Sequence, residues 1–370
     1  MGVDGLLFSL IAPAVPRLAD RYDLFDAEVA FVFAAFPAAM LIAAVVGVGL
    51  VERIGERNAM LLGGGLLVVA TIAFAIAPGA LGLLLARALQ GVGGGLAWTA
   101  AIGGVAGAFP AEQRGVRLAA LESAAGGSGL VAPVIGGVAL DRIGLQATFL
   151  AAAALATLAL APVWIMRDVG ARVTVSARGI IAVLERPAAR AGVVATVVVG
   201  GVLALLEPLL PLDLDERLGL SATGIGLVFA AGSGAYLVGA PIMGRVSDRR
   251  GRRGPLVAGL LGTALALPLM AVGPIWVPVL AFVVVGFGPG AAIGPTGALI
   301  SQRVDEADPG GAYGLGGALL VFVFATGYLV GPVFGGVASL GLPFLAVLSI
   351  AAAAILLAAT VCDRLLAAPA

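Results

Sequence analysis

The chain has 370 residues, of which 61% are hydrophobic and 11% are charged, and its 21 basic and 21 acidic residues give a formal net charge of zero. A water-soluble domain needs more polar surface than this to cover its core, so the composition excludes an ordinary soluble globular protein. All 21 basic residues are arginine and histidine is absent. This excludes a lysine-containing phosphate-binding loop, a Ser-His-Asp triad and a histidine-ligated metal. We therefore expect no enzyme activity, no cofactor, no bound metal and no nucleic-acid partner.

Apolar stretches of about 20 residues recur along the whole chain, and each is long enough to cross a hydrocarbon layer of ~30 Å as a helix. Lipid offers no hydrogen bonds to free backbone groups, so these stretches must be helical. We predict an all-α integral membrane protein with twelve transmembrane helices. In chain order they cover 2–18, 27–51, 59–77, 81–108, 118–140, 147–166, 191–211, 222–243, 255–273, 276–300, 314–338 and 343–361.

The arginines of the connecting segments are distributed unequally across the membrane. Sixteen fall on one side and four, Arg17, Arg21, Arg142 and Arg217, fall on the other. The positive-inside rule assigns the arginine-rich side to the cytoplasm, and an even number of helices then places both termini there. We expect a multi-pass protein of the inner or plasma membrane, embedded in the lipid bilayer and functional as a monomer.

Four pairs of motifs recur in the same order at offsets of 195 to 199 residues. They are Pro13-x-x-Pro16 with Pro208-x-x-Pro211, glycines 91, 93 and 95 with 286, 288 and 290, Glu52-Arg53-x-Gly55 with Asp248-Arg249-x-Gly251, and Pro133-x-x-Gly136-Gly137 with Pro332-x-x-Gly335-Gly336. Six helices separate the copies, so both copies face the same way, as in a parallel repeat. We predict two six-helix bundles, 1–166 and 191–370, related by a pseudo-twofold axis along the membrane normal. The polar, basic segment 167–190 is the predicted cytoplasmic linker, with an interfacial helix near 179–185 or a plain solvated tether as its two readings.

The strongest local signal lies between the eighth and ninth predicted helices. The segment reads Gly244-Arg-Val-Ser-Asp248-Arg249-Arg250-Gly251-Arg252-Arg253. Gly251 permits a tight turn, and the Asp248 carboxylate can pair with an arginine or cap a neighbouring helix. A simple positive-inside anchor is the alternative. The segment resembles the cytoplasmic-loop signature of the major facilitator superfamily, and this resemblance implies that its charges latch one conformational state. The degenerate first copy keeps Glu52 and Arg53 for that role.

Two further motifs lie within predicted spans. The fourth helix contains Arg87-x-x-Gln90-Gly91. An arginine inside a membrane costs about 2.5–3.5 kcal/mol, so we expect it to face a cavity or a partner, with snorkelling to the surface as the alternative. The motif resembles the facilitator helix-4 motif, in which the arginine is linked to proton coupling.

The fifth helix contains Gly129-Leu-Val-Ala132-Pro133-Val-Ile-Gly136-Gly137, and the eleventh repeats it as Gly331-Pro332-Val-Phe-Gly335-Gly336. These small residues predict a kinked helix face that packs closely against a neighbour. The first copy resembles the antiporter motif of the twelve-helix drug/proton antiporters, although Ala132 stands where that motif usually has glycine.

Three acidic residues, Asp4, Glu122 and Glu207, fall within apolar spans. Burial disfavours the charged form of a carboxyl group, so such residues can exchange protons near neutral pH. Glu122 and Glu207 each lie about one turn from a predicted helix end, and an interfacial, wet position is the alternative for both.

Together these motifs resemble vesicular amine transporters and their bacterial drug-exporting relatives, over nearly the whole chain. The resemblance implies a cavity near the membrane midplane between two rocking bundles. It also implies that Asp4 and Glu207 recognise a cationic substrate or carry protons. The remaining residues expected at this site are Arg87, Gln90, Trp98 and Tyr236, with Phe8 and Phe322 as apolar walls.

Two departures qualify the resemblance. An acidic residue of the amine transporters aligns with Val321, which leaves amine selectivity and proton stoichiometry open. From Gly2 to Pro16 the first span has 15 residues, about 22 Å of helix against a core of ~30 Å. We therefore expect a start upstream of Met1, with a shortened product as the alternative.

The expected function is proton-coupled export, that is antiport, of a small hydrophobic or cationic compound by alternating access. A proton symporter that imports a small metabolite is the alternative within transport. A non-transporting membrane receptor or sensor is the alternative from another class, but it would not need matched glycine and proline repeats.

Overall fold

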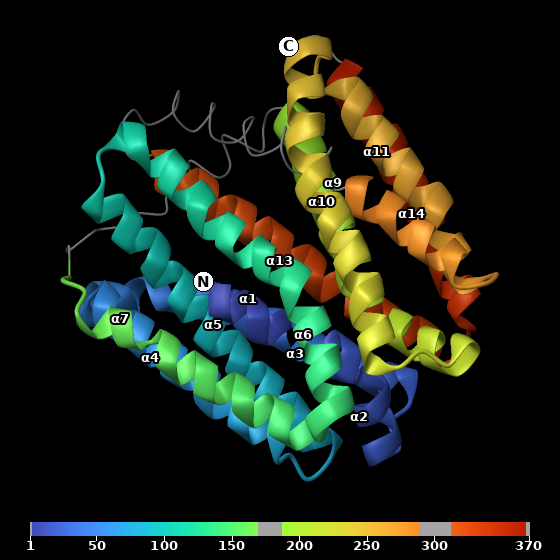
Figure 1. Cartoon of the computed structure of the whole chain (residues 1–370). Coiled ribbons are helices and arrows are strands. Elements are labelled where there is room, and N and C mark those ends of the chain that lie inside the picture. The colour runs from blue at the N-terminus through green and yellow to red at the C-terminus, as the bar shows by residue number, and fades with distance from the viewer. Residues whose placement is uncertain (1, 169–186, 289–311, 368–370) are drawn as a thin grey trace. The chain divides into compact units, whose positions relative to one another are not determined.

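The computed structural model describes residues 2–168, 187–288 and 312–367, and every regular element in these ranges is a helix (Figure 1). Ten of the described helices are long and apolar enough to cross a membrane. One of them, α6 (Ala111–Ala159), joins two predicted spans across a kink at Gly144, where φ is 80°. A shorter apolar helix, Trp276–Gly288, begins the predicted span 276–300. Each of the twelve predicted spans thus falls on a helix or part of one, which confirms the all-helical membrane architecture. The predicted interfacial helix at 179–185 and the remainder of 276–300 lie outside the described residues.

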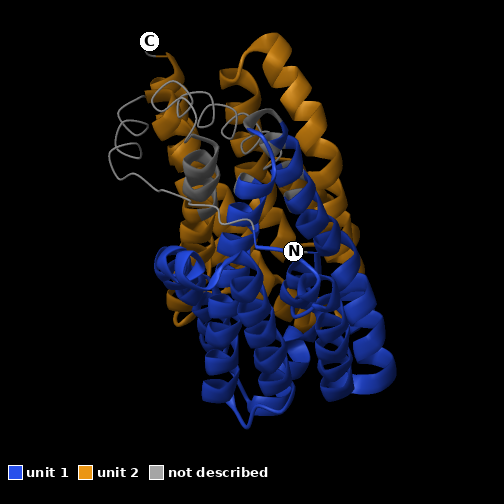
Figure 2. Cartoon of the chain, turned by 90° about the vertical axis from the view of Figure 1, so that its left-hand side faces the viewer, with its two compact units in different colours: residues 1–174, 221–226 blue, residues 175–220, 227–370 orange. Residues whose placement is uncertain are grey.

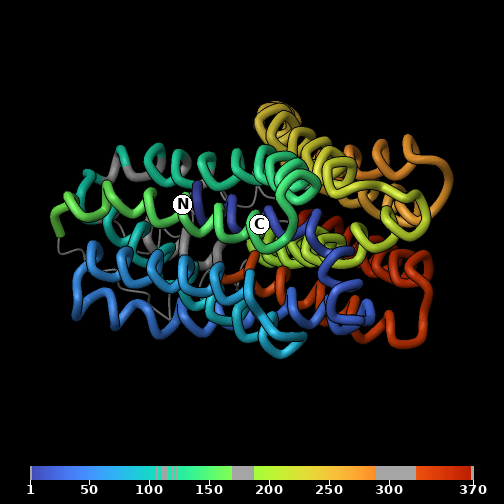
Figure 3. The backbone as a smooth tube through the Cα atoms, turned by 60° about the horizontal axis from the view of Figure 1, so that its bottom comes forward, coloured from blue at the N-terminus to red at the C-terminus, as the bar shows by residue number. Residues whose placement is uncertain are grey.

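The first compact unit comprises residues 1–174 and 221–226 (Figure 2, blue). Its helix α5 packs against α3 and α4, and α6 packs against α1 and α4 (Figure 3). Besides α6, its elements are α1 (Gly2–Ser9), η1 (Ala12–Ala14), α2 (Val15–Tyr22), α3 (Asp26–Ile54), α4 (Glu56–Ala75), α5 (Ala80–Ala108) and α7 (Ala161–Trp164).

The first predicted span is a broken helix. Pro13 lies in η1 and Pro16 lies in the first turn of α2. Proline has no backbone N–H and its ring clashes with the preceding turn, so the α-helical ladder is interrupted here. The break separates α1, which carries Asp4 and Phe8, from α2.

The second compact unit comprises residues 175–220 and 227–370 (Figure 2, orange). Its helix α9 packs against α13 and α14, and α14 also packs against α11. The helices are α9 (Pro187–Leu218), α10 (Ala222–Arg250), α11 (Arg253–Ala266), η2 (Leu267–Ala271), Trp276–Gly288, α13 (Ala312–Ser339) and α14 (Phe344–Ala367). Residues 222–226 of α10 belong to the first unit. α9 begins at Pro187, so the last four residues of the segment predicted as a linker are helical.

The glycine motifs make equivalent contacts in the two units. A Cβ atom on Gly91 would overlap the carbonyl oxygen of Phe36 on α3, and one on Gly286 would overlap the carbonyl oxygen of Gly232 on α10. Both the glycines and their partners are 195 or 196 positions apart in the sequence. Only glycine allows backbones to approach this closely.

The next glycine of each motif contacts the next helix in each unit. A Cβ on Gly93 would lie 2.7 Å from the carbonyl oxygen of Gly63 on α4, and one on Gly288 would lie 2.8 Å from that of Gly259 on α11. These partners are also 196 positions apart. The sequence repeat therefore encodes one arrangement of helices, built once in each unit.

The glycines of α6 and α13 also lie at close helix contacts. A Cβ on Gly136 would lie 2.9 Å from the Leu10 side chain, and one on Gly331 would overlap the carbonyl oxygen of Gly201 on α9. Gly335 faces Leu205 and Leu209 of the same helix. The neighbour is the first helix of its unit in both cases.

These contacts predict that two glycine-to-alanine substitutions differ in their effect on the melting temperature. Gly331→Ala should lower the melting temperature of the purified protein in detergent, because overpacking costs about 1–3 kcal/mol. Gly65→Ala, on α4 where a Cβ would meet no atom within 4 Å, should leave the melting temperature unchanged or raise it slightly, because alanine favours the helix by about 1 kcal/mol. A melting temperature for Gly331→Ala equal to or above that of Gly65→Ala would contradict the close approach of α13 and α9.

Candidate functional site

The first polar group within the membrane-spanning helices is Asp4 on α1. The Trp98 indole Nε1 on α5 donates a hydrogen bond of 2.8 Å to its Oδ2. Its Oδ1 is buried and has no hydrogen-bond partner in the described part of the chain. A Cβ on Gly94 would lie 3.2 Å from that oxygen, so a larger residue there would crowd the carboxyl group. The arrangement leaves one carboxyl oxygen able to accept a proton or meet a cation.

Arg87 on α5 lies deep inside the first unit, with only 1% of its surface exposed. Its guanidinium carbon is 5.3 Å from the ring centroid of Phe8, 4.9 Å from that of Phe33 and 5.0 Å from that of Phe36. Three aromatic faces thus surround the cation, and each attracts it through the ring quadrupole. Snorkelling to the surface, the alternative raised by the sequence, does not occur.

A short hydrogen-bond chain continues from Arg87 to α4. Arg87 Nη1 donates to Gln90 Oε1 at 3.2 Å, and Gln90 Nε2 donates to Thr71 Oγ1 at 3.2 Å. Thr71 in turn donates to the Leu67 carbonyl oxygen at 2.7 Å. Gln90 is 2% exposed. Arg87 and Gln90 therefore tie helices together in this conformation and do not line an open surface.

Phe8 and Phe36 connect the two polar groups. Their ring centroids are 4.9 Å apart, Phe8 lies one turn after Asp4 on α1, and the Phe36 ring is 3.6 Å from the Cβ position of Gly94. The first unit thus brings Asp4, Trp98, Arg87 and Gln90 into one neighbourhood. Phe33, Phe36 and Thr71 belong to it as well, but in the sequence they are ordinary members of apolar spans.

The second unit carries a separate acidic group. Glu207 on α9 is half-buried, and the Tyr328 hydroxyl on α13 donates to its Oε1 at 3.3 Å. Tyr236 lies on α10, and the Phe324 and Tyr328 rings lie against each other with centroids 4.6 Å apart and a tilt of 38°. In the sequence Tyr328 lies between glycines, and the sequence alone did not identify it as a site residue. The signal that could have found it is a tyrosine within an apolar span, because a buried tyrosine hydroxyl usually has a hydrogen-bond partner.

Phe322, expected as an apolar wall, has 46% of its surface exposed. The side chains of Glu122 and Val321 lie outside the described residues.

The corner between α10 and α11 contains the charged loop. Gly251 has a φ of 82°, in the left-handed region that favours glycine. Arg253 donates two hydrogen bonds to Asp363 of α14, from Nε to Oδ1 at 2.6 Å and from Nη2 to Oδ2 at 2.9 Å. Asp248 and Arg249 are exposed and form no ion pair with any described residue. The carboxylate that holds an arginine here is thus Asp363, which lies outside the loop motif, and not Asp248.

The corner between α3 and α4 has the same three kinds of residue: a glycine with a positive φ, an arginine and an aspartate. Gly55 has a φ of 84°, and the backbone N–H of Arg57 donates to Asp168 Oδ1 at 2.7 Å. The Arg57 guanidinium donates to the Trp164 carbonyl oxygen at 2.8 and 3.2 Å. Within the described ranges, the exposed Glu52 and Arg53 make no ion pair. Glycine, arginine and aspartate in the two corners are 195 or 196 positions apart.

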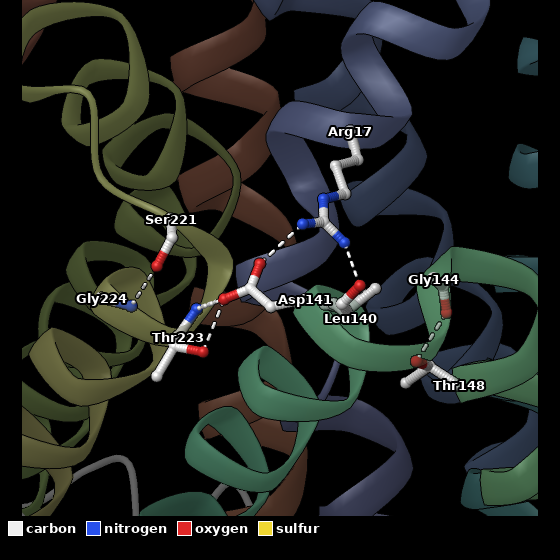
Figure 4. Close-up of polar contacts among 8 residues, drawn as sticks. All are labelled: Arg17, Leu140, Asp141, Gly144, Thr148, Ser221, Thr223 and Gly224. Atoms are coloured by element: carbon white, nitrogen blue, oxygen red, sulfur yellow. Dashed lines mark hydrogen bonds and ion pairs between the residues drawn. The ribbon is translucent and has the colours of Figure 1, made fainter.

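A further polar cluster in the first unit escaped sequence analysis (Figure 4). Arg17 Nη2 pairs with Asp141 Oδ1 at 2.6 Å, and its Nη1 donates to the Leu140 carbonyl oxygen. Asp141 Oδ2 accepts hydrogen bonds from the Thr223 backbone N–H at 2.9 Å and hydroxyl at 2.6 Å. The Asp141 carboxylate thereby caps the first turn of α10 from another helix, which stabilises that helix start.

The sequence was compared with known proteins. The model of the Major Facilitator Superfamily matches residues 1–189 and 192–365. The synaptic vesicular amine transporter of Rattus norvegicus is 28% identical over 307 residues, which cover 80% of this chain and 58% of that protein. The class H tetracycline resistance protein of Pasteurella multocida is 31% identical over 137 residues, which cover 36% of this chain and 33% of that protein. The chain therefore spans little more than half the length of the first relative and a third of the second.

The structure was compared with solved structures. A bacterial homologue of the human lysosomal transporter Spinster, in an inward-facing and unoccupied conformation, matches with a TM-score of 0.77 at 16% identity. The match covers 100% of this chain and 96% of that one. At this identity the likeness concerns the fold alone, and it confirms the predicted major facilitator fold.

Proposed function

The chain belongs to the major facilitator superfamily, and from that premise we propose that it exports a small hydrophobic or cationic compound in exchange for protons. The observation that carries this proposal is the buried Asp4 carboxyl group, which has one oxygen held by Trp98 and the other without a partner among the described residues. A carboxyl group in this position can bind a proton or a cation, but not both at once. Competition of this kind is what couples proton entry to cation exit.

The Glu207–Tyr328 pair supplies the second ionisable group of the proposal. Moving one proton inward across ~100 mV yields about 2.3 kcal/mol before any pH gradient is counted. The relatives support the substrate class, since their names refer to amine transport and to tetracycline resistance.

The proposed architecture has two six-helix bundles, 1–166 and 191–370, that rock around a midplane site. Both termini are cytoplasmic in this proposal, and the monomer in the inner or plasma membrane is the working unit. The conformational latch is proposed to lie at the corner between α3 and α4 and at the corner between α10 and α11. In the first corner the Asp168 carboxylate, just after the sixth predicted helix, accepts a hydrogen bond from the Arg57 backbone N–H. In the second the Asp363 carboxylate, just after the twelfth predicted helix, accepts one from the Arg253 guanidinium.

Transport in proteoliposomes tests the proposal and separates it from its alternatives. We suggest ethidium, a hydrophobic fluorescent cation, as the transported probe and trapped pyranine as the reporter of lumenal pH. An acidic lumen should drive ethidium uptake while protons leave. Uptake driven only by an acidic exterior would indicate a symporter, and binding of ethidium without flux in either gradient would indicate a receptor.

Asp4→Asn is expected to weaken binding of ethidium by at least about tenfold, because a charge-assisted contact is worth roughly 1.5–3 kcal/mol. Binding of an uncharged hydrophobic analogue should change little. Titration of the purified protein in detergent measures both affinities. Asp20→Asn, at an exposed position of α2, is the matched control. Equal losses for the cation and the neutral analogue would remove Asp4 from cation recognition.

A further inference from the structure

We propose that the corner between α10 and α11 in the second unit is a binding site for a singly charged phosphate group, that of an anionic membrane phospholipid. This site lies at one of the corners proposed as the latch. It goes beyond the proposed transport function because it gives that corner a lipid ligand, whose binding is measured without any transport step.

The corner contains an open pocket of about 510 Å³. Its lining combines residues of the α10–α11 corner, Ser247, Asp248, Gly251, Arg252 and Arg253, with the apolar side chains of Ala188 on α9 and Leu366 on α14. A lining that is both charged and apolar suits the phosphate of a lipid together with the start of its glycerol and acyl chains. It is less suited to a free ion.

Ser247 is the observation that points to a ligand. It is 4% exposed, and its hydroxyl oxygen is buried with no hydrogen-bond partner in the described part of the chain. Two other buried hydroxyl groups, Thr71 and Thr263, donate to the carbonyl group four residues earlier. The buried Thr196 hydroxyl on α9 also has no partner among the described residues, but it does not line this pocket. Ser247 lacks such a bond, and a phosphate oxygen in the pocket would provide its acceptor.

The charges around the pocket favour an anion. Arg252 lines it and forms no ion pair within the described ranges. Arg253 is held in place by its two hydrogen bonds to Asp363. Arg252 and the next residue begin α11 without a side-chain cap, so the free N–H groups and the positive end of the helix dipole also lie at this corner.

Asp248 decides between the possible sources of phosphate. Its carboxylate is the one acidic group in the lining, and it repels a dianion more strongly than a monoanion. A lipid phosphodiester carries one negative charge near neutral pH, whereas inorganic phosphate is there a mixture of singly and doubly charged forms, and Asp248 disfavours the doubly charged form. The neighbouring Arg249 and Arg250 keep the corner positive as a whole, which attracts anionic lipid surfaces.

Native mass spectrometry of the purified full chain tests the proposal without any substrate or gradient. Phosphatidylglycerol should be retained, and diacylglycerol, which lacks the phosphate, should not. Ser247→Ala and Arg252→Gln should each lower phosphatidylglycerol occupancy about tenfold, the effect of losing a hydrogen bond to a charged group. Ser349→Ala and Arg364→Gln make the same chemical changes outside the pocket, and they should retain the lipid as the unaltered chain does.

Three outcomes are informative. Displacement of phosphatidylglycerol by millimolar inorganic phosphate would keep the phosphate site but make free phosphate its source. Equal losses in Arg252→Gln and Arg364→Gln would mean that net charge alone retains the lipid, and would overturn the proposal. Unchanged occupancy in both pocket variants, with melting temperatures like that of the unaltered chain, would overturn it too. None of these results bears on whether ethidium is exchanged for protons.

Discussion

Glu207→Gln is expected to reduce pH-gradient-driven ethidium accumulation in proteoliposomes to the level of protein-free liposomes. Glutamine has the size of glutamate and keeps an acceptor for the Tyr328 hydroxyl, which lies 3.3 Å from Glu207 Oε1. It cannot bind or release a proton, so the substitution removes coupling and preserves the local packing. Exchange of external for internal ethidium without a gradient should therefore persist.

Glu216→Gln on the same helix is the matched control. Glu216 is exposed near the C-terminal end of α9, and its substitution should leave gradient-driven uptake intact. If Glu207→Gln accumulates ethidium as well as Glu216→Gln does, Glu207 carries no coupling proton. If it loses gradient-free exchange as well, its role is in substrate binding and coupling must be assigned elsewhere.

Arg87→Ala is expected to lower the melting temperature of the purified protein by about 10 °C. Removing one partner from a buried charged network typically costs about 3–5 kcal/mol, and 1 kcal/mol corresponds to roughly 2–4 °C in a chain of this order of size. The substitution would leave a cavity among Phe8, Phe33 and Phe36 and would take the donor from Gln90 Oε1.

Two comparisons make the Arg87 measurement specific. Arg142→Ala removes an arginine at an exposed position and should change the melting temperature by no more than about 2 °C, since surface substitutions usually fall within 0.5 kcal/mol. Arg87→Lys keeps the charge but loses the planar group that contacts three rings and Gln90, so it should lie between the other two variants. A melting temperature for Arg87→Ala like that of Arg142→Ala would show that the aromatic cage contributes nothing to stability.

The fold was largely predictable from the sequence because its two strongest signals are periodic. Apolar runs of membrane-spanning length locate the helices, and glycines at a constant offset reveal the repeat. The structure adds a reason for the offset. Gly91 and Gly286 each need a helix backbone within reach of their Cα atoms, on Phe36 and Gly232 respectively. Such a requirement survives divergence better than the identity of any apolar side chain.

The site was only partly predictable, because its contacts join residues that are distant in the sequence. Asp4 and Arg87 stand out as charges in apolar spans, and the structure places both in the first unit near Phe8 and Phe36. Phe33 and Phe36 do not stand out, because a phenylalanine that faces lipid and one that covers a cation look the same in an apolar run. Asp141, Asp168 and Asp363 read as ordinary helix-end residues. Their roles depend on which helix end lies beside which arginine, and a single sequence does not encode this as a pattern.

The matching corners have a consequence for the history of the chain. Glycine, arginine and aspartate occupy equivalent places at Gly55, Arg57 and Asp168 and, 195 or 196 positions later, at Gly251, Arg253 and Asp363. Asp168 follows the last predicted span of the first half, and Asp363 lies near the end of α14, so each corner ties a turn between two helices to the end of its own half. Duplication of one six-helix unit would carry this contact into both copies. The two corners differ in how the arginine is bound to the aspartate, by its backbone N–H in the first and by its guanidinium in the second.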